Sequence, residues 1–95
     1  LVEMDRRINA TRAWMAELCE RVDRGEAPIA QLAECKVQAS RTMEFCAREA
    51  SQILGGASYL RGNPVERLYR EVRVNAIGGG SEEIMIDLAA RQLGI

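Results

Sequence analysis

Histidine is absent from the 95 residues of this chain. Its absence removes the side chain that most often serves proteins as a general base and as a metal ligand. Three cysteines are present, Cys19, Cys35 and Cys46, an odd number without CxxC spacing. This pattern argues against both a disulfide framework and a zinc site, so we expect no metal-binding residue. We interpret the cysteines as small apolar packing residues, and free thiols fit a reducing compartment, the cytoplasm.

Long apolar runs and blocks of one charge are also missing. No segment is apolar for the length that a membrane-spanning helix requires, and no signal peptide is visible. The net charge is −1, from 13 basic and 14 acidic residues spread along the chain, which disfavours a nucleic-acid-binding surface. The length suggests one domain. Because the chain begins at Leu1 inside a helical pattern, without a capping residue, we expect it to be part of a longer protein.

The first half predicts two long amphipathic helices. Apolar residues recur at spacings of three and four over positions 1–22, with Thr11 as a polar break, and again over positions 32–53. The first helix should end near Arg24-Gly25, and Pro28 is placed to start the second. Such a short link makes the helices antiparallel. The two stripes are Leu1, Met4, Ile8, Thr11, Met15, Leu18 and Val22, and Leu32, Cys35, Ala39, Met43, Cys46, Ala50 and Ile53.

A third, short helix is predicted after a loop over residues 57–62. Asn63 is a suitable N-cap, Pro64 suits the first helical position, and Glu66 completes a capping-box-like arrangement. This helix should run to about Asn75. We interpret its arginines as partners of neighbouring acids rather than as phosphate ligands; these arginines are Arg67, Arg70 and Arg73, and the acids include Glu66 and Glu71.

A fourth helix is predicted after three consecutive glycines. Ser81 should cap it, and two acids, Glu82 and Glu83, lie in its positive first turn. Three glycines before a capped helix expose backbone N–H groups that suit an anion, a carbonyl oxygen or a hydroxyl. The two acids disfavour a phosphate at this place. We expect Ile84, Leu88 and Met85 to face the core.

The second half resembles the C-terminal helical domain of acyl-CoA dehydrogenases. Over positions 52–84 it contains Gln-Ile-Leu-Gly-Gly-Ala-Ser-Tyr, then Pro-Val-Glu-Arg-Leu-Tyr-Arg-Glu, then Ile-Gly-Gly-Gly-Ser-Glu-Glu-Ile. These match the family's glutamine-x-x-Gly-Gly turn, its Pro-Val-Glu-Arg-x-Tyr-Arg-acid helix and its Ile-x-x-Gly-Thr/Ser-x-Glu-Ile segment. The resemblance continues more weakly through the first half. It implies an all-α fold over residues 1–95, an antiparallel hairpin with a short third and a fourth helix, most of the four-helix bundle at the C-terminus of a longer flavoprotein.

The resemblance also implies a cofactor and its contacts. FAD would be the cofactor, bound as part of a homodimer or homotetramer. Gln52, Gly55 and Gly56 would line the FAD site of a neighbouring subunit. Ser81 and Glu83 would lie near the FAD of the subunit's own site.

The implied reaction is oxidation of an acyl-CoA thioester to the 2,3-enoyl-CoA, with an electron-accepting flavoprotein as partner. The backbone of Gly79, with Gly80 beside it, would bind the substrate thioester, and its N–H would polarise the carbonyl. We expect the isolated piece to be inactive, because most of both sites would lie in missing parts.

Two positions depart from the family pattern. Many members carry the catalytic glutamate at the position of Gly79, so no catalytic residue is expected in this chain, and the base would lie upstream or be absent. Ser58 replaces the family's usual third glycine. The alternative hypothesis is therefore a non-catalytic helical assembly module that keeps the family's subunit-packing surface. A missing bundle helix should leave an apolar groove and favour self-association.

Overall fold

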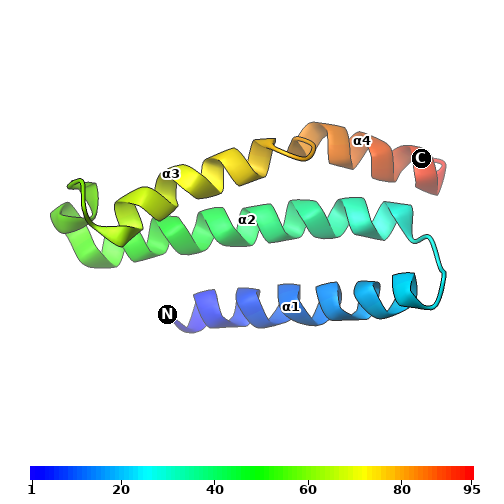
Figure 1. The fold of residues 1–95 in the computed structure, drawn as a ribbon, viewed down its shortest axis with the longest axis horizontal. Coiled ribbons are helices and arrows are strands. Elements are labelled where there is room, and N and C mark those ends of the chain that lie inside the picture. The colour runs from blue at the N-terminus through cyan, green and yellow to red at the C-terminus, as the bar shows by residue number, and fades with distance from the viewer.

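The computed structural model describes residues 1–95, and all of its regular structure is helical (Figure 1). The elements are α1 (Val2–Asp23), α2 (Ile29–Leu54), a 3₁₀ turn η1 (Gly55–Tyr59), α3 (Pro64–Ile77) and α4 (Glu82–Leu93). The all-α prediction, with a long hairpin followed by two shorter helices, is confirmed.

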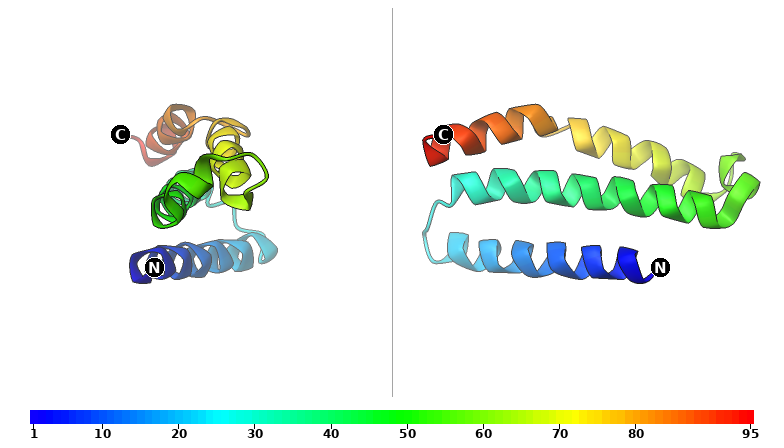
Figure 2. Two further views of the ribbon diagram at one scale, coloured as in Figure 1. Left: turned by 90° about the vertical axis from the view of Figure 1, so that its left-hand side faces the viewer. Right: turned by 180° about the vertical axis from the view of Figure 1, so that it is seen from behind.

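Helix α2 is the centre of the molecule. It packs against α1 on one side, while α3 and α4 run back along it on the other (Figures 1 and 2). Because α1 has no comparable contact with α3 or α4, the molecule is elongated, with extents of 46 × 24 × 21 Å. None of the helices combines the length and the apolar character needed to cross a membrane.

The hairpin link forms as predicted. Helix α1 ends at Asp23, where the N–H of Arg24 donates to the Glu20 carbonyl at 3.1 Å. Gly25 follows with a φ of +85°, a conformation that glycine adopts without the steric cost that a side chain brings. Pro28 immediately precedes the first residue of α2. Local backbone chemistry therefore places both helix ends of the hairpin.

Small residues make up most of the core. Ala30 and Ala33 of α2 pack with Ala89 of α4, and Met85 and Leu88 lie against this cluster. The prediction that Met85 and Leu88 face the core is confirmed. The alanines let α4 lie close to α2 but bury little apolar area each.

Two large apolar residues depart from this pattern in opposite directions. Leu18 is the one large side chain that is almost fully buried, with 1% of its surface exposed. Ile84, predicted to face the core, is 59% exposed, so that prediction is wrong. In the first turn of α4 it is Met85, not Ile84, that packs against the core.

The two predicted apolar stripes are only partly buried. On α1, Thr11 and Leu18 alone are buried, and on the predicted α2 stripe only Cys35 is. The physical reason is that α2 contacts three helices on different sides, so its buried positions surround it instead of following one stripe. The buried residues of α2 are Ala30, Ala33, Cys35, Val37, Ser40, Thr42 and Ala47.

Thr11 is not a break in the apolar contact but part of a buried polar pair. Its Oγ1 lies 3.0 Å from Oγ1 of Thr42, and the Gln38 amide nitrogen lies 3.4 Å from both hydroxyls. Both threonines are buried, at 6% and 5% exposure. Because a buried hydroxyl needs a partner, this pair favours one register of α1 against α2.

Removing one of these two hydroxyls should lower the free energy of unfolding by more than half of the loss in the double variant. Thr42→Val leaves the Thr11 hydroxyl buried with only the Gln38 amide at 3.4 Å, and an unsatisfied buried polar group costs about 1–3 kcal/mol. The Thr11→Val/Thr42→Val double variant has neither hydroxyl, so part of that loss should be recovered. Urea unfolding of the four proteins gives the coupling energy. Strictly additive losses would contradict a hydrogen bond between the two threonines.

Helix α3 is capped by one residue rather than by a reciprocal pair. Asn63 Oδ1 accepts the Val65 N–H at 2.9 Å, as predicted. The predicted return bond from Glu66 does not form, because the Asn63 N–H donates to the Leu60 carbonyl at 3.2 Å and the Glu66 carboxylate binds Arg70 at 2.6 Å. The capping-box prediction is therefore half right.

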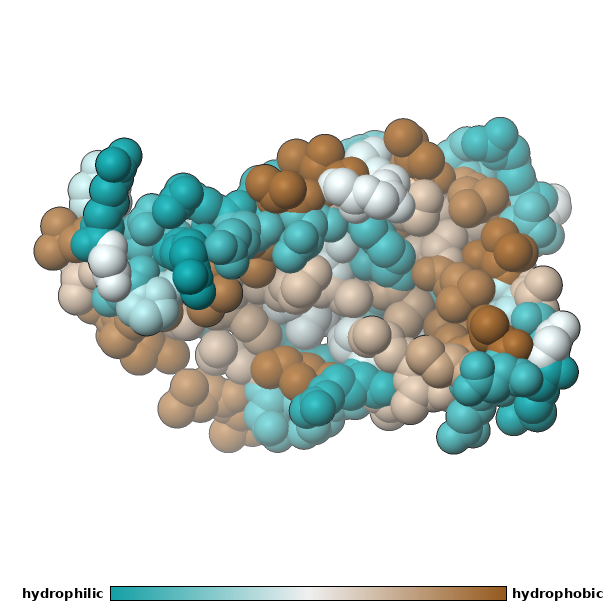
Figure 3. All heavy atoms as spheres, viewed as in Figure 1, coloured by the Kyte–Doolittle hydropathy of each residue, from teal (hydrophilic) through white to brown (hydrophobic).

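Many apolar side chains remain on the surface. Figure 3 shows apolar residues over α3 and α4 and between the two helices of the hairpin. A groove of about 430 Å³ runs between α1 and α2, as expected from the sequence. Its apolar lining includes Met15, Leu18, Val22, Leu32 and Cys35.

The cysteines are all free. Cys35 is buried and Cys46 half-buried, and burial raises the pKa of both thiols. Cys19 is exposed and lines the groove. The interpretation of the cysteines as apolar packing residues therefore fits Cys35 and Cys46 better than it fits the exposed Cys19.

Candidate functional site

Three glycines join α3 to α4, and two of them adopt backbone conformations that side chains rarely allow. Gly79 has a φ of +71° and Gly80 a φ of +110°. A methyl group on Gly80 would overlap the Met85 side chain, whose Sδ would lie 3.1 Å away. At Gly79 no atom lies within 4 Å of the corresponding position. A side chain at Gly80 would therefore force Met85 to shift, whereas the space beside Gly79 is open.

The turn carries backbone donors without partners. No acceptor in the chain takes the N–H groups of Gly79, Gly80 or Ser81, whereas the Gly78 N–H donates to the Val74 carbonyl at 2.7 Å. Ser81 occupies the N-cap position, but its side chain makes no capping hydrogen bond, so the prediction is right in position and wrong in bonding. The free donors lie at the positive end of the α4 dipole.

Lys36 of α2 holds the carbonyl side of the same turn. Its Nζ donates to the carbonyl oxygens of Asn75 at 3.2 Å, Ala76 at 3.1 Å and Gly80 at 2.6 Å. The first two belong to the last turn of α3, where carbonyls lack helical partners and a cation is favoured. Sequence analysis missed this role, because spacing places Lys36 on a helix but gives no sign of partners some forty residues later.

The two acids that begin α4 have different surroundings. The Glu82 carboxylate pairs with the guanidinium of Arg41, which lowers the pKa of Glu82. Glu83, predicted from the resemblance to contact a cofactor, is exposed and makes no ion pair within the chain. The charge of Glu82 is therefore balanced by Arg41, whereas the Glu83 carboxylate has no ion-pair partner in the chain.

A second exposed turn lies at the far end of α2. Gln52, Gly55 and Gly56 are all exposed, and Gly55 ends the helix with a φ of +60°. No atom lies within 4 Å of a Cβ position on either glycine. The backbone here can therefore approach another molecule closely, as the glycine pattern suggested.

Ser58 shapes this second turn. It is buried, and its Oγ lies 2.7 Å from the Ser51 Oγ, 2.7 Å from the Gly55 carbonyl oxygen and 3.0 Å from the Ser51 carbonyl oxygen. These contacts tie residues 55–59 to the end of α2 as a 3₁₀ turn. The prediction of a loop over residues 57–62 is therefore wrong for its first half.

The structure does not bring the two groups of predicted site residues together. Gln52 lies sixteen residues beyond Lys36 on the same helix, which corresponds to about 24 Å along the axis. Gly79, Gly80, Ser81 and Glu83 cluster near Lys36, at the opposite part of α2. The two turns therefore lie at separate places along α2.

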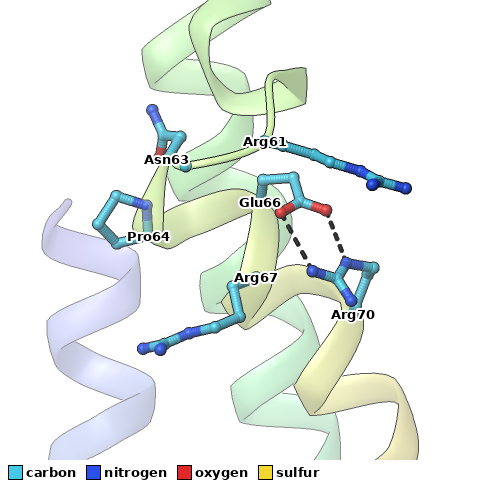
Figure 4. A pocket seen from close by; sticks show the side chains of 7 residues that line it. Arg61, Asn63, Pro64, Glu66, Arg67 and Arg70 are labelled. Atoms are coloured by element: carbon cyan, nitrogen blue, oxygen red, sulfur yellow. Dashed lines mark hydrogen bonds and ion pairs between the residues drawn. The ribbon is translucent and has the colours of Figure 1, made fainter.

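A third hollow, of about 650 Å³, lies at the start of α3 and is lined mainly by polar side chains. Figure 4 shows Arg70 bonded to Glu66, with Arg61 beside them and Arg67 pointing the other way. Arg67 lies 3.5 Å from Glu71. Together with the 2.6 Å pair between Arg73 and Glu44, these contacts confirm the prediction that the α3 arginines pair with acids.

Comparison with known proteins gives consistent matches. The model of the acyl-CoA dehydrogenase C-terminal domain matches residues 1–94. The chain is 50% identical over 60 residues to an acyl-CoA dehydrogenase of Alternaria alternata, covering 60% of this chain and 14% of that protein. It is 31% identical over 93 residues to an acryloyl-CoA reductase (NADH) of Anaerotignum propionicum, covering 98% of this chain and 24% of that one. An acyl-CoA dehydrogenase structure from Geobacillus kaustophilus superposes with a TM-score of 0.94 at 29% identity, covering 99% and 25% of the two chains.

The central α2 helix, its hairpin partner and the glycine turn between α3 and α4 define an all-α bundle domain. The chain spans about a quarter or less of these relatives. It belongs to the acyl-CoA dehydrogenase family, a family of oxidoreductases, and corresponds to the family's C-terminal domain.

Proposed function

We propose that this chain is the C-terminal domain of a longer FAD-dependent acyl-CoA dehydrogenase that oxidises an acyl-CoA thioester to the 2,3-enoyl-CoA. The observation that carries the proposal is the turn at Gly79, Gly80 and Ser81, which has unpaired N–H groups on an open flank. Membership of the family supplies the reaction class. The 95 residues alone are proposed to be inactive, because they supply only part of each binding site.

The turn suits the task of binding a thioester carbonyl. The N–H of Gly79 has no internal acceptor and would donate to the carbonyl oxygen. A donor fixed in place before the reaction stabilises the negative charge that develops on that oxygen, and this makes the neighbouring α-hydrogen more acidic. The absence of a side chain at Gly79 and Gly80 lets the substrate approach the backbone.

The same turn and the α2 end would hold the cofactor from two subunits. Ser81 contributes a free N–H and an uncommitted hydroxyl, and Glu83 an exposed carboxylate, to the subunit's own FAD. Gln52, Gly55 and Gly56 offer an open backbone and an exposed amide to the FAD of a neighbouring subunit. The chemistry that FAD would supply in this site is acceptance of a hydride from the β-carbon, while these residues would hold and orient it.

The proton acceptor is proposed to lie outside this chain. By the family resemblance Gly79 matches the position of the usual glutamate, and no carboxylate of the turn takes its place: Glu82 is paired with Arg41 and Glu83 follows three residues after Gly80. A carboxylate upstream of Leu1 would then remove the α-proton. An electron-accepting flavoprotein would reoxidise the enzyme, and a homodimer or homotetramer would complete the sites.

One observation favours a second candidate, the non-catalytic assembly module. Gly79 leaves this chain without a base, and large apolar side chains such as Leu60, Val74 and Ile77 are more than half exposed. An intact protein built for packing alone would keep these surfaces and bind no flavin.

The deciding experiment uses the intact protein. We would purify it, record its flavin spectrum without oxygen, and add short, branched and long acyl-CoAs in turn. Bleaching of the oxidised flavin band by one of them is expected. Since one relative is an acryloyl-CoA reductase, the chemically reduced protein would also be mixed with 2,3-enoyl-CoAs, and reoxidation by them without bleaching by acyl-CoAs would reverse the proposed direction. A protein that binds no flavin would overturn the redox proposal and leave the assembly module.

A further inference from the structure

Lys36 is the one lysine of the chain, and the structure uses all of its donors. An ammonium group has three N–H donors and no acceptor. Three carbonyl oxygens, those of Asn75, Ala76 and Gly80, lie within 3.2 Å of Nζ. Lys36 comes from α2, two of its partners from the end of α3 and the third from the turn. One side chain therefore joins three segments at the place where the candidate site lies.

The bond to Gly80 has a consequence on the other side of the turn. The Gly80 carbonyl and the Ser81 N–H belong to one peptide unit, which is trans, so the two groups point in opposite directions. Holding the carbonyl on Lys36 therefore directs the Ser81 N–H away from α2. An ammonium on the carbonyl also polarises the peptide and strengthens its N–H as a donor.

The other contacts of the turn do not fix it in this way. Gly79 and Gly80 make no backbone hydrogen bond through their N–H groups, and Ser81 lacks a side-chain cap. Glycine has a wide conformational freedom, which costs entropy when it is ordered. Without Lys36, the main restraint on the backbone of Gly79 and Gly80 would be the Met85 side chain, which lies next to Gly80.

We propose that Lys36 is a positioning residue: it fixes the Gly80–Ser81 peptide so that the unpaired Ser81 N–H faces the bound cofactor, and through that peptide it keeps the neighbouring Gly79 N–H beside the acyl thioester. The inference rests on the proposed function for its ligands. A positioning role differs from simple C-capping of α3 by Lys36, because C-capping would stabilise α3 without changing the rate of the reaction at the turn.

The first test measures the turn itself. In the intact protein, Lys36→Met keeps a long apolar stem and removes the three donors. We expect hydrogen exchange to become faster by about tenfold at the two hydrogen-bonded amides that border the turn, Gly78 and Met85, while exchange in α1 stays unchanged. Arg73→Met is the matched control, because it also removes a cation that links α3 to α2, the 2.6 Å pair with Glu44, but not one that binds the turn. Unchanged exchange at Gly78 and Met85 in Lys36→Met would overturn the inference.

The second test separates positioning from stability. Stopped-flow reduction of the flavin by the best acyl-CoA gives a rate and a dissociation constant for each variant. Lys36→Met should lower the rate by about tenfold or more with a smaller change in the dissociation constant, because a misplaced donor weakens reactivity more than binding. Lys36→Arg, which keeps the charge, should recover part of the rate. Arg73→Met should match the wild type.

The outcomes distinguish the two proposals. Faster exchange in Lys36→Met with an unchanged reduction rate would make Lys36 a structural contact only and overturn the positioning role. If no acyl-CoA reduces the wild-type flavin, the proposed function fails, and the exchange measurement still decides whether Lys36 fixes the turn.

Discussion

Leu18→Ala should destabilise this chain more than any other single truncation of an apolar side chain. Leu18 is 1% exposed and is the one large side chain that is almost fully buried. Truncation of a buried leucine to alanine costs about 2–5 kcal/mol, from lost apolar contact and from the cavity left behind. Because most other buried apolar residues are alanines, little else compensates. Urea unfolding followed by circular dichroism measures the loss.

Leu93→Ala provides the matched control. Leu93 lies at the end of α4 and is 49% exposed, so the same chemical change should cost about 0.5 kcal/mol, the scale of an ordinary surface substitution. Similar losses for the two variants would mean that Leu18 is not the central contact of the hairpin.

Gly80→Ala should have the second largest effect, and it should exceed that of Gly79→Ala. Both glycines have positive φ, which costs a residue with a side chain about 1–2 kcal/mol. Gly80→Ala adds a methyl group that overlaps the Met85 side chain, so Met85 or the turn must move. Since Met85 packs against the alanine cluster and Lys36 binds the Gly80 carbonyl, either movement disturbs the core or the candidate site.

A rescue experiment separates strain from overlap. Thermal unfolding of Gly79→Ala, Gly80→Ala and Gly80→Ala/Met85→Ala would be compared with Met85→Ala alone. The extra cost of Gly80→Ala should shrink in the Met85→Ala background, because the overlapping atoms are gone. Equal costs at Gly79 and Gly80 would show that Met85 gives way freely and that only the backbone conformation matters.

The parts of the fold that sequence analysis predicted are those fixed by neighbouring residues. Gly25, Pro28 and Asn63 act on the backbone within a few positions, so the helix ends that depend on them appear where expected. The short link predicted the antiparallel hairpin, and the resemblance to a known family implied how the third and fourth helices complete the bundle.

Contacts between distant residues explain what sequence analysis missed. In the sequence Thr11 interrupts an apolar stripe, but in the structure its hydroxyl pairs with that of Thr42. Lys36 has the spacing of a surface cation, but it binds carbonyl oxygens at the end of α3. The buried face of α2 was mispredicted because a helix with neighbours on two sides, α1 on one and α3 and α4 on the other, has no single apolar stripe. At the candidate site, the positions of Gly79 and Ser81 could be predicted, whereas the bonding of the turn depends on a residue of another helix.

The attachment of α1 has a consequence for how the molecule opens. Helix α1 packs mainly along α2, so separation from that one helix would release most of its tertiary contacts at once. Helices α3 and α4 are instead connected by the turn between Ile77 and Glu82, and each of them packs against α2. Cooperative units of this kind open at different free energies. We therefore expect α1 to separate as one unit from the body formed by α2, α3 and α4, with the glycine turn between α3 and α4 left assembled.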